Sequence, residues 1–194
     1  MKHPDIIEAV HPVIKIFEQL SIPYYVGGSI ASSLYGMARA TMDVDLVADI
    51  KAKHAVTLNS SLEENYYIDE EMILEAIRQD SSFNLIHLET MIKIDVFIPK
   101  NEPYQKEVLQ RRKADTFEEG AASGEFYFSS PEDIILNKLQ WYEMGGRVSE
   151  RQWLDVIGVI KIQSNLLDAD YLRQWAARLH LLELLEKAYQ EANI

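Results

Sequence analysis

The stretch Tyr24-Tyr25-Val26-Gly27-Gly28-Ser29 decides how this chain folds. Its apolar part predicts a short strand, the two glycines a turn, and the residues from Ser29 to about 35 a helix. Glycines let the backbone approach a phosphate closely, and a helix N-terminus offers unpaired amide hydrogens and the positive end of the helix dipole. Ser29 can cap this helix and also donate its hydroxyl. The stretch is therefore a candidate phosphate cradle, and a plain turn is the alternative.

Two aspartates follow on the next predicted strand, 43–48. Asp43 and Asp45 are two residues apart, so both carboxylates point to the same side of a strand. Two like charges so close are costly unless a cation or a base lies between them. Magnesium suits this position because it accepts one or two protein carboxylates and takes its other ligands from water and substrate phosphates. The alternative is a solvent-facing strand with two structural aspartates.

A third aspartate, Asp95, lies in the apolar segment 91–98. Its alternation places isoleucine and valine on one face of a strand and Lys93, Asp95 and Phe97 on the other. A third acid can help to bind a second metal ion and to deprotonate an attacking hydroxyl. The alternative is an ion pair with a neighbouring base such as Lys93.

The order of these motifs resembles the polymerase-beta-like nucleotidyltransferase superfamily. Its minimal pattern is a Gly-Gly/Ser turn, a strand with two acids at alternate positions, and a third acid on a later strand. The matching residues are Gly28, Ser29, Asp43, Asp45 and Asp95. The resemblance implies that Gly27, Gly28 and Ser29 hold a nucleoside triphosphate and that the three acids are the catalytic metal ligands.

A finer resemblance links the chain to the abortive-infection-type (AbiEii-like) branch. That branch has an Arg-x-Thr-x-Asp-x-Asp strand, matched by Arg39 and Thr41, and a lysine on a later helix, matched by Lys138. Its Arg/Lys-Asp-x-x-Asp segment is matched only by Arg151 and Asp155, because Gln152, Trp153 and Leu154 interrupt the usual charged cluster. The resemblance implies that Arg39, Thr41, Lys138 and Asp155 contribute to nucleotide binding.

Each of these residues also has a local alternative. Arg39 can pair with Asp43 or Asp49, and Asp155 lies four residues after Arg151, which allows a helical ion pair. Lys138 shares a helix face with apolar residues, so it either extends outward to water or meets an anion, either a phosphate or Asp155. The basic run 111–113 is interpreted as a solvated helix end.

The fold class expected from these elements is α/β: a small, mixed, twisted sheet flanked by helices. After residue 128 every segment predicts helix, beginning with the N-cap Ser130 and Pro131. We therefore expect a nucleotidyltransferase core at 1–128 and a C-terminal helical lobe at 129–194. The three tryptophans fall at helical positions beside aliphatic residues and predict packing sites.

Composition narrows the function classes. The chain has 194 residues, no cysteine and a formal net charge of −12, so disulfides and cysteine metal sites are excluded and non-specific duplex binding is disfavoured. No apolar run approaches a membrane span and the N-terminus is unlike a signal peptide, so we expect a cytoplasmic protein without a membrane partner.

Together these features predict a magnesium-dependent enzyme, with manganese as the alternative ion, that moves a nucleoside monophosphate from a nucleoside triphosphate such as ATP to an acceptor hydroxyl. The acceptor is an RNA end, a protein or a small molecule, and toxin–antitoxin or phage defence is one setting for it. The alternative function is a non-catalytic nucleotide-sensing or partner-binding module on the same fold.

Overall fold

The structure is a computed structural model that describes residues 3–37, 41, 43–116 and 125–194. The chain divides into two compact units, which are described separately. The first unit comprises Met1–Gly27 and Ala40–Phe128, and the second comprises Gly28–Arg39 and Ser129–Ile194. Residues 28–39, which the sequence analysis placed in the α/β core, are thus grouped with the C-terminal helices.

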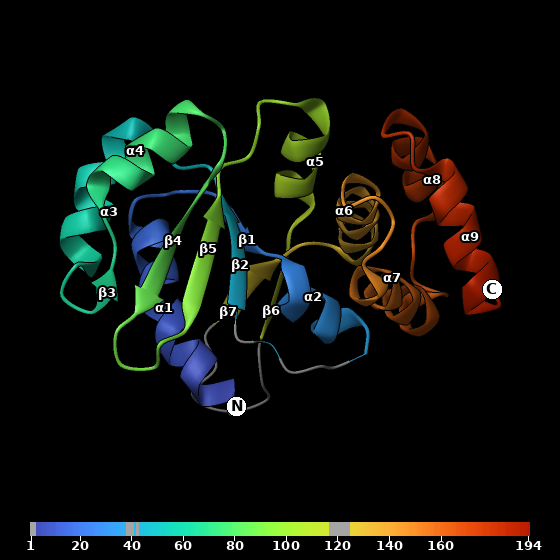
Figure 1. Cartoon of the computed structure of the whole chain (residues 1–194), viewed down its shortest axis with the longest axis horizontal. Coiled ribbons are helices and arrows are strands. Elements are labelled where there is room, and N and C mark those ends of the chain that lie inside the picture. Colours follow the sequence, from blue (N-terminus) through green and yellow to red (C-terminus); the bar gives the residue numbers. More distant parts are fainter. Residues whose placement is uncertain (1–2, 38–40, 42, 117–124) are drawn as a thin grey trace. The chain divides into compact units, whose positions relative to one another are not determined.

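The first unit contains one mixed sheet and four α-helices within the described residues (Figure 1). Its strands are β1 (Tyr24–Val26), β2 (Asp43–Ala48), β3 (Tyr66–Tyr67), β4 (Ser82–His87), β5 (Lys93–Phe97), β6 (Lys113–Thr116) and β7 (Glu125–Phe128). Its helices are α1 (His3–Gln19), α3 (Ala55–Leu62), α4 (Glu70–Arg78) and α5 (Pro103–Arg111), with a 3-10 turn at Ala52–His54.

The strand order in the sheet is β3-β4-β5-β2-β1-β7-β6. The pairs β2/β5 and β1/β7 are parallel, and the other four pairs are antiparallel. In the β2/β5 pair, Asp43 lies beside Lys93 and Asp45 lies beside Asp95. The sheet is therefore mixed, and it brings together strands that are about 50 residues apart in the sequence.

Strict alternation along the central strands separates a buried face from an open one. Val44, Leu46, Ile94 and Val96 are fully buried, while the residues between them are half-buried or exposed. Helix α1 covers the buried face: the ring of Phe17 contacts Tyr24, and the Tyr66 hydroxyl donates a hydrogen bond to the Ala9 carbonyl at 2.8 Å. Figure 1 shows α1 behind β4 and β5, with α3 and α4 at the β3–β4 edge. The open face carries the three aspartates and Lys93, together with Val47 and Phe97.

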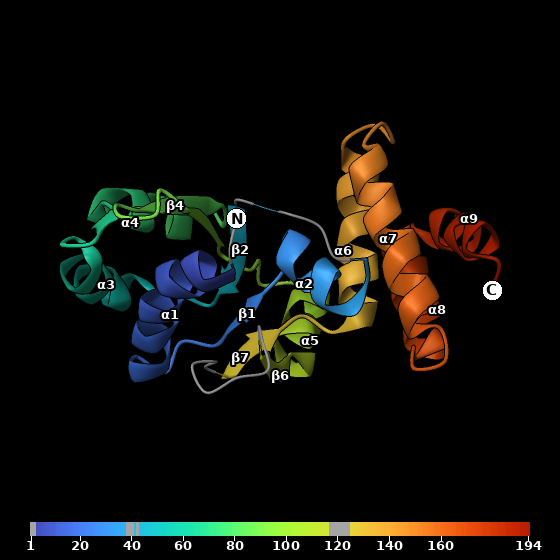
Figure 2. The ribbon, with the colours of Figure 1, turned by 90° about the horizontal axis from the view of Figure 1, so that it is seen from below.

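The second unit is helical and consists of α2 (Gly28–Tyr35), α6 (Pro131–Met144), α7 (Glu150–Gln163), α8 (Ala169–Arg178) and α9 (Leu182–Ala192). Three of these helices begin at a capping side chain that accepts a backbone amide hydrogen: Ser130 for α6, Ser149 for α7 and Asp168 for α8. Figure 2 shows α6 and α7 running side by side. The N-cap predicted at Ser130 is present as expected.

Close approach of α2 to α7 depends on glycine. A Cβ atom added to Gly36 would lie 2.7 Å from the Ser32 carbonyl oxygen and 3.0 Å from the Val159 amide nitrogen. The Gln163 side-chain amide donates a hydrogen bond to the Tyr35 carbonyl at 3.1 Å, which ties the C-terminal end of α2 to the C-terminal end of α7. These interactions explain why residues 28–39 belong to the helical unit.

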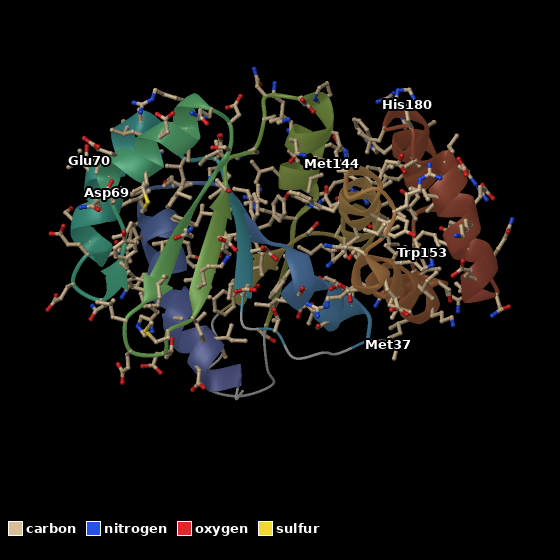
Figure 3. The ribbon with its side chains drawn as sticks, viewed as in Figure 1. Met37, Asp69, Glu70, Met144, Trp153 and His180 are labelled. Carbon is tan, nitrogen blue, oxygen red and sulfur yellow. The ribbon has the colours of Figure 1, made fainter. Side chains whose placement is uncertain are left out.

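Two expectations from the sequence differ from the structure. Residues 113–116 form strand β6, so the basic run 111–113 leaves α5 and enters a strand, where the Arg112 guanidinium lies 4.8 Å from the centre of the Tyr127 ring. Trp141 is 54% exposed, unlike Trp153 and Trp175, which are buried. Figure 3 shows Trp153 on α7, where its indole nitrogen donates a hydrogen bond to Glu191.

Among the described residues, no helix is both long and apolar enough to span a bilayer.

Candidate functional site

The candidate site lies on the open face of β2 and β5. Side chains of β2 alternate between the two faces of the sheet. Val44 and Leu46 point into the core, so Asp43 and Asp45 lie on the open face, where Asp43 is exposed and Asp45 is half-buried. The parallel register places Asp95 directly beside Asp45. The structure thus brings together the three aspartates that the sequence singled out.

A lysine lies among these carboxylates. The Lys93 ammonium is 2.8 Å from Asp95 Oδ2, and the Lys93 backbone lies beside that of Asp43. The hydrogen bond that the Lys93 ammonium donates to Asp95 is the largest of the influences that raise the pKa of Lys93. The charges of Asp95, Asp43 and Asp45 also raise this pKa, and burial opposes them. Lys93 is therefore a residue of this site, a role that the sequence analysis considered only as an ion-pair partner for Asp95.

Electrostatics explain why a positive charge is favoured here. Neighbouring strands lie about 5 Å apart. Two unit negative charges about 5 Å apart repel by roughly 1 kcal/mol in water and about 3 kcal/mol at an effective dielectric constant of about 20. The backbones of Asp45 and Asp95 are neighbours across the β2/β5 pair, and Asp43 adds a third negative charge on the same face. A cation is needed to offset this repulsion, and Lys93 supplies one unit of positive charge.

The donor set of this face fits a divalent cation in part. Two carboxylates, Asp43 and Asp45, match the one or two that magnesium takes from proteins when a substrate supplies phosphate oxygens. Within the part of the chain that the structure describes, no group of three or more His, Asp or Glu side chains is arranged to hold a metal ion. The three-aspartate metal site therefore stays a prediction.

The glycine turn lies beside the same strand. The Gly27 amide donates a hydrogen bond of 2.9 Å to the Asp45 carbonyl, so this amide is committed to the sheet. Gly28 has a positive φ of 55°, a conformation that glycine adopts without strain, and α2 begins there. Amides of the first turn of α2 thus remain the candidate phosphate donors, and Ser29 lies in this turn. The binding role of Gly27, Gly28 and Ser29 is still a prediction.

The two remaining motif residues before β2 have different outcomes. Arg39 lies outside the described residues. The Thr41 hydroxyl donates to the Asp43 carbonyl at 3.1 Å and is 3.4 Å from the Asp43 amide nitrogen, which donates to it. Thr41 therefore fixes the backbone at the start of β2, next to the first aspartate.

Lys138 and Asp155 form an ion pair inside the helical unit. The Lys138 ammonium is 2.7 Å from Asp155 Oδ2, and the two side chains are only 6% and 8% exposed. Of the two anions considered for Lys138, a phosphate and Asp155, the structure provides Asp155. The pair joins α6 to α7, and the assignment of both residues to nucleotide binding stays a prediction.

Comparison with solved structures identifies the fold. The structure of ANT(2'')-Ia in complex with adenylyl-2''-tobramycin is similar with a TM-score of 0.55 and 16% identity, over 90% of this chain and 96% of that chain. The fold is a nucleotidyltransferase fold. The solution structure of the antibiotic-resistance factor ANT(2'')-Ia gives a TM-score of 0.53 and 14% identity, over 93% and 96%.

A third solved structure is also similar. An antigenic nucleotidyltransferase-like protein from Paracoccidioides brasiliensis matches with a TM-score of 0.53 and 17% identity, over 95% of this chain and 92% of that chain. No protein-family model and no curated protein matches the sequence. The α/β fold class predicted from the sequence is confirmed, and the abortive-infection-type branch stays a prediction.

Proposed function

We propose that this protein transfers a nucleoside monophosphate from a nucleoside triphosphate to an acceptor hydroxyl. The observation that carries the proposal is the cluster of Asp43, Asp45 and Asp95 on the open face of β2 and β5, in a nucleotidyltransferase fold. Carboxylates in this number serve metal-assisted phosphoryl chemistry, and a structural role alone does not require three of them side by side.

In this proposal Asp43 and Asp45 hold one magnesium or manganese ion. The ion, when bound, neutralises phosphate charge and polarises the α-phosphate. The first-turn amides of α2, including that of Ser29, receive phosphate oxygens at the positive end of the helix dipole. Thr41 keeps Asp43 in place through its two backbone contacts.

The transfer itself balances as follows. The acceptor oxygen forms a bond to the α-phosphorus, the bond from that phosphorus to the oxygen bridging to the β-phosphate breaks, and pyrophosphate leaves. The acceptor proton passes to the Asp95 carboxylate, whose Oδ2 atom contacts Lys93. Arg39 and Lys138 are proposed to neutralise the charge of the triphosphate, and Asp155 is proposed to position the Lys138 ammonium, which it contacts at 2.7 Å.

We favour a small-molecule acceptor over an RNA end or a protein. A net charge of −12 opposes the approach of a polyanion such as RNA. ANT(2'')-Ia, the neighbour described above, was solved with adenylyl-2''-tobramycin, an adenylylated small molecule. A role in phage defence or as a toxin rests on the resemblance to the abortive-infection-type branch.

The ion pair between Lys93 and Asp95 supports a second candidate, a non-catalytic nucleotide-sensing or partner-binding module. In such a module the acid that would accept the proton is engaged by a lysine. Calorimetric titration with ATP, GTP, CTP and UTP, with and without magnesium, detects nucleotide binding in both cases. Binding without any transfer activity favours the module.

Transfer is tested with each α-labelled nucleoside triphosphate, magnesium and a lysate fractionated into RNA, protein and small molecules. We expect label in the small-molecule fraction, and Asp43→Asn should lower its incorporation at least 100-fold because a metal ligand is lost. Asp170→Asn is the matched control, since Asp170 is an exposed acid of α8. Full activity of both Asp43→Asn and Asp45→Asn would show that these residues hold no catalytic metal.

A further inference from the structure

Lys93 lies at the rim of the acidic cluster formed by Asp43, Asp45 and Asp95 on the open face of β2 and β5. Its ammonium contacts Asp95 at 2.8 Å, and the sheet register places it next to Asp43. Within strands β2, β4 and β5, which are described throughout, Lys93 is the one basic residue on that face. The neighbour of Asp95 on the other side is Asn84, which carries no charge. Among these three strands, positive charge on the open face therefore comes from Lys93.

The position of Lys93 is fixed by the fold. It lies two residues before Asp95 on the same strand, so both side chains leave β5 on the same face. The Lys93 side chain is 43% exposed and that of Asp95 is 22% exposed, so this cation stands at the rim of the acidic cluster.

We propose that this site holds a single divalent cation, on Asp43 and Asp45, and that the Lys93 ammonium takes the place of a second cation beside Asp95. This inference rests on the proposed function and replaces the second metal ion in it. A tethered ammonium has a high effective concentration at the carboxylate. A second divalent ion would have to displace the Lys93 ammonium, because the ion pair already occupies the Asp95 carboxylate that this ion would need as a ligand.

The proposal assigns two roles to Lys93. It is the cation that offsets the repulsion between Asp45 and Asp95, and it makes the site selective for one divalent ion rather than two. An ammonium is a compact point charge, so arginine at this position keeps the charge while methionine keeps only the length of the side chain. These two substitutions separate charge from bulk.

The test counts Mn²⁺ ions bound to the full chain in the presence of α,β-methylene-ATP, by electron paramagnetic resonance of free Mn²⁺ and by calorimetry. We expect one Mn²⁺ per chain for the wild type and for Lys93→Arg. In Lys93→Met we expect a second Mn²⁺, bound at least tenfold more tightly than any second ion in the wild type. Lys100→Met, which removes an exposed lysine beyond the end of β5, should behave as the wild type.

Two outcomes would overturn the inference. One is a wild-type chain that binds two Mn²⁺ ions with similar affinity, and the other is a folded Lys93→Met variant that binds only one. Circular dichroism establishes that each variant is folded. If Asp43→Asn and Asp45→Asn bind Mn²⁺ as tightly as the wild type, or if the wild type binds no Mn²⁺, the proposed function fails together with this inference. A single ion in both wild type and Lys93→Met overturns the inference alone.

Discussion

The buried ion pair between Lys138 and Asp155 provides the sharpest test of the helical unit. Its nitrogen–oxygen distance is 2.7 Å, and its side chains are 6% and 8% exposed. Lys138→Met removes the cation and leaves a carboxylate in a site that solvent hardly reaches. Removal of one partner from a buried pair costs about 3–5 kcal/mol of unfolding free energy.

Protonation of the remaining carboxyl limits this cost. An ordinary aspartate has a pKa of about 3.9, so protonating it costs about 4 kcal/mol at pH 7 and about 1.5 kcal/mol at pH 5. We therefore expect Lys138→Met to lower the free energy of unfolding by about 3–4 kcal/mol at pH 7 and by at most about 1.5 kcal/mol at pH 5. For a urea m-value of about 2 kcal/mol/M, the midpoint should shift by roughly 1.5–2 M at pH 7.

Urea titrations followed by circular dichroism at the two pH values measure both losses. Arg173→Met is the control, because the Arg173–Glu186 pair spans 4.0 Å and both side chains are more than half exposed. We expect this control to change the free energy of unfolding by less than about 0.5 kcal/mol. A loss below about 1 kcal/mol in Lys138→Met, with no dependence on pH, would refute the argument that the pair is buried and essential.

The double variant Lys138→Met/Asp155→Leu separates stability from function. Replacement of a buried ion pair by apolar side chains of similar volume is often neutral, so we expect most of the lost stability to return. If Lys138 also neutralises a bound triphosphate, this folded double variant should still lose transfer activity. A stable double variant with wild-type activity would refute the assignment of Lys138 to nucleotide binding.

Two further predictions concern packing and pH. Gly36→Ala should lower the free energy of unfolding by about 1–3 kcal/mol, because the added Cβ would lie 2.7 Å from the Ser32 carbonyl oxygen; a urea titration measures this, and an unchanged midpoint would contradict the close contact. Burial, and secondarily the charge of Lys53, lowers the pKa of His54, whose Nδ1 accepts the Lys51 amide hydrogen. As the pH falls through 6.5, His54 therefore takes up a proton more readily in the unfolded chain than in the folded chain. Stability should therefore fall below pH 6.5, and His54→Gln should flatten this slope in thermal melts between pH 7 and 5.5; an identical slope in the variant would exclude His54 as its source.

Local periodicity was sufficient for most of the elements around the site. Alternation in 43–48 and 91–98 predicted the two strands and the open face that carries the aspartates, and Ser130 predicted the start of α6. Strand β6 was missed because Lys113-Ala114-Asp115-Thr116 has no apolar alternation, and its pairing with β7 defines it as a strand. Trp141 is exposed rather than buried, because a helical position beside aliphatic residues does not reveal which side of the helix faces solvent.

Side-chain partners were the least predictable part of the candidate site. The sequence left Lys138 with two anions to choose from, and the choice of Asp155 depends on how α6 and α7 lie against each other. The Gly27 amide, within the predicted phosphate cradle, donates to the Asp45 carbonyl because β1 and β2 are neighbours in the sheet, and the role of Gly27 in the cradle stays a prediction. Both contacts join separate elements, α6 with α7 and β1 with β2, and the sequence does not show how these elements align with each other.

The sequence by itself determined which side of each strand the acids occupy, because alternation is a property of a single strand. It thereby identified Asp43, Asp45 and Asp95 and the order of motifs typical of nucleotidyltransferases. Only the tertiary structure decided that β5 lies parallel to β2 with Asp95 beside Asp45 and Lys93 beside Asp43. The reason is that interstrand register is set by hydrogen bonds and core packing across about 50 residues of intervening chain, and this register brings Lys93, the partner of Asp95 on β5, next to Asp43 on β2.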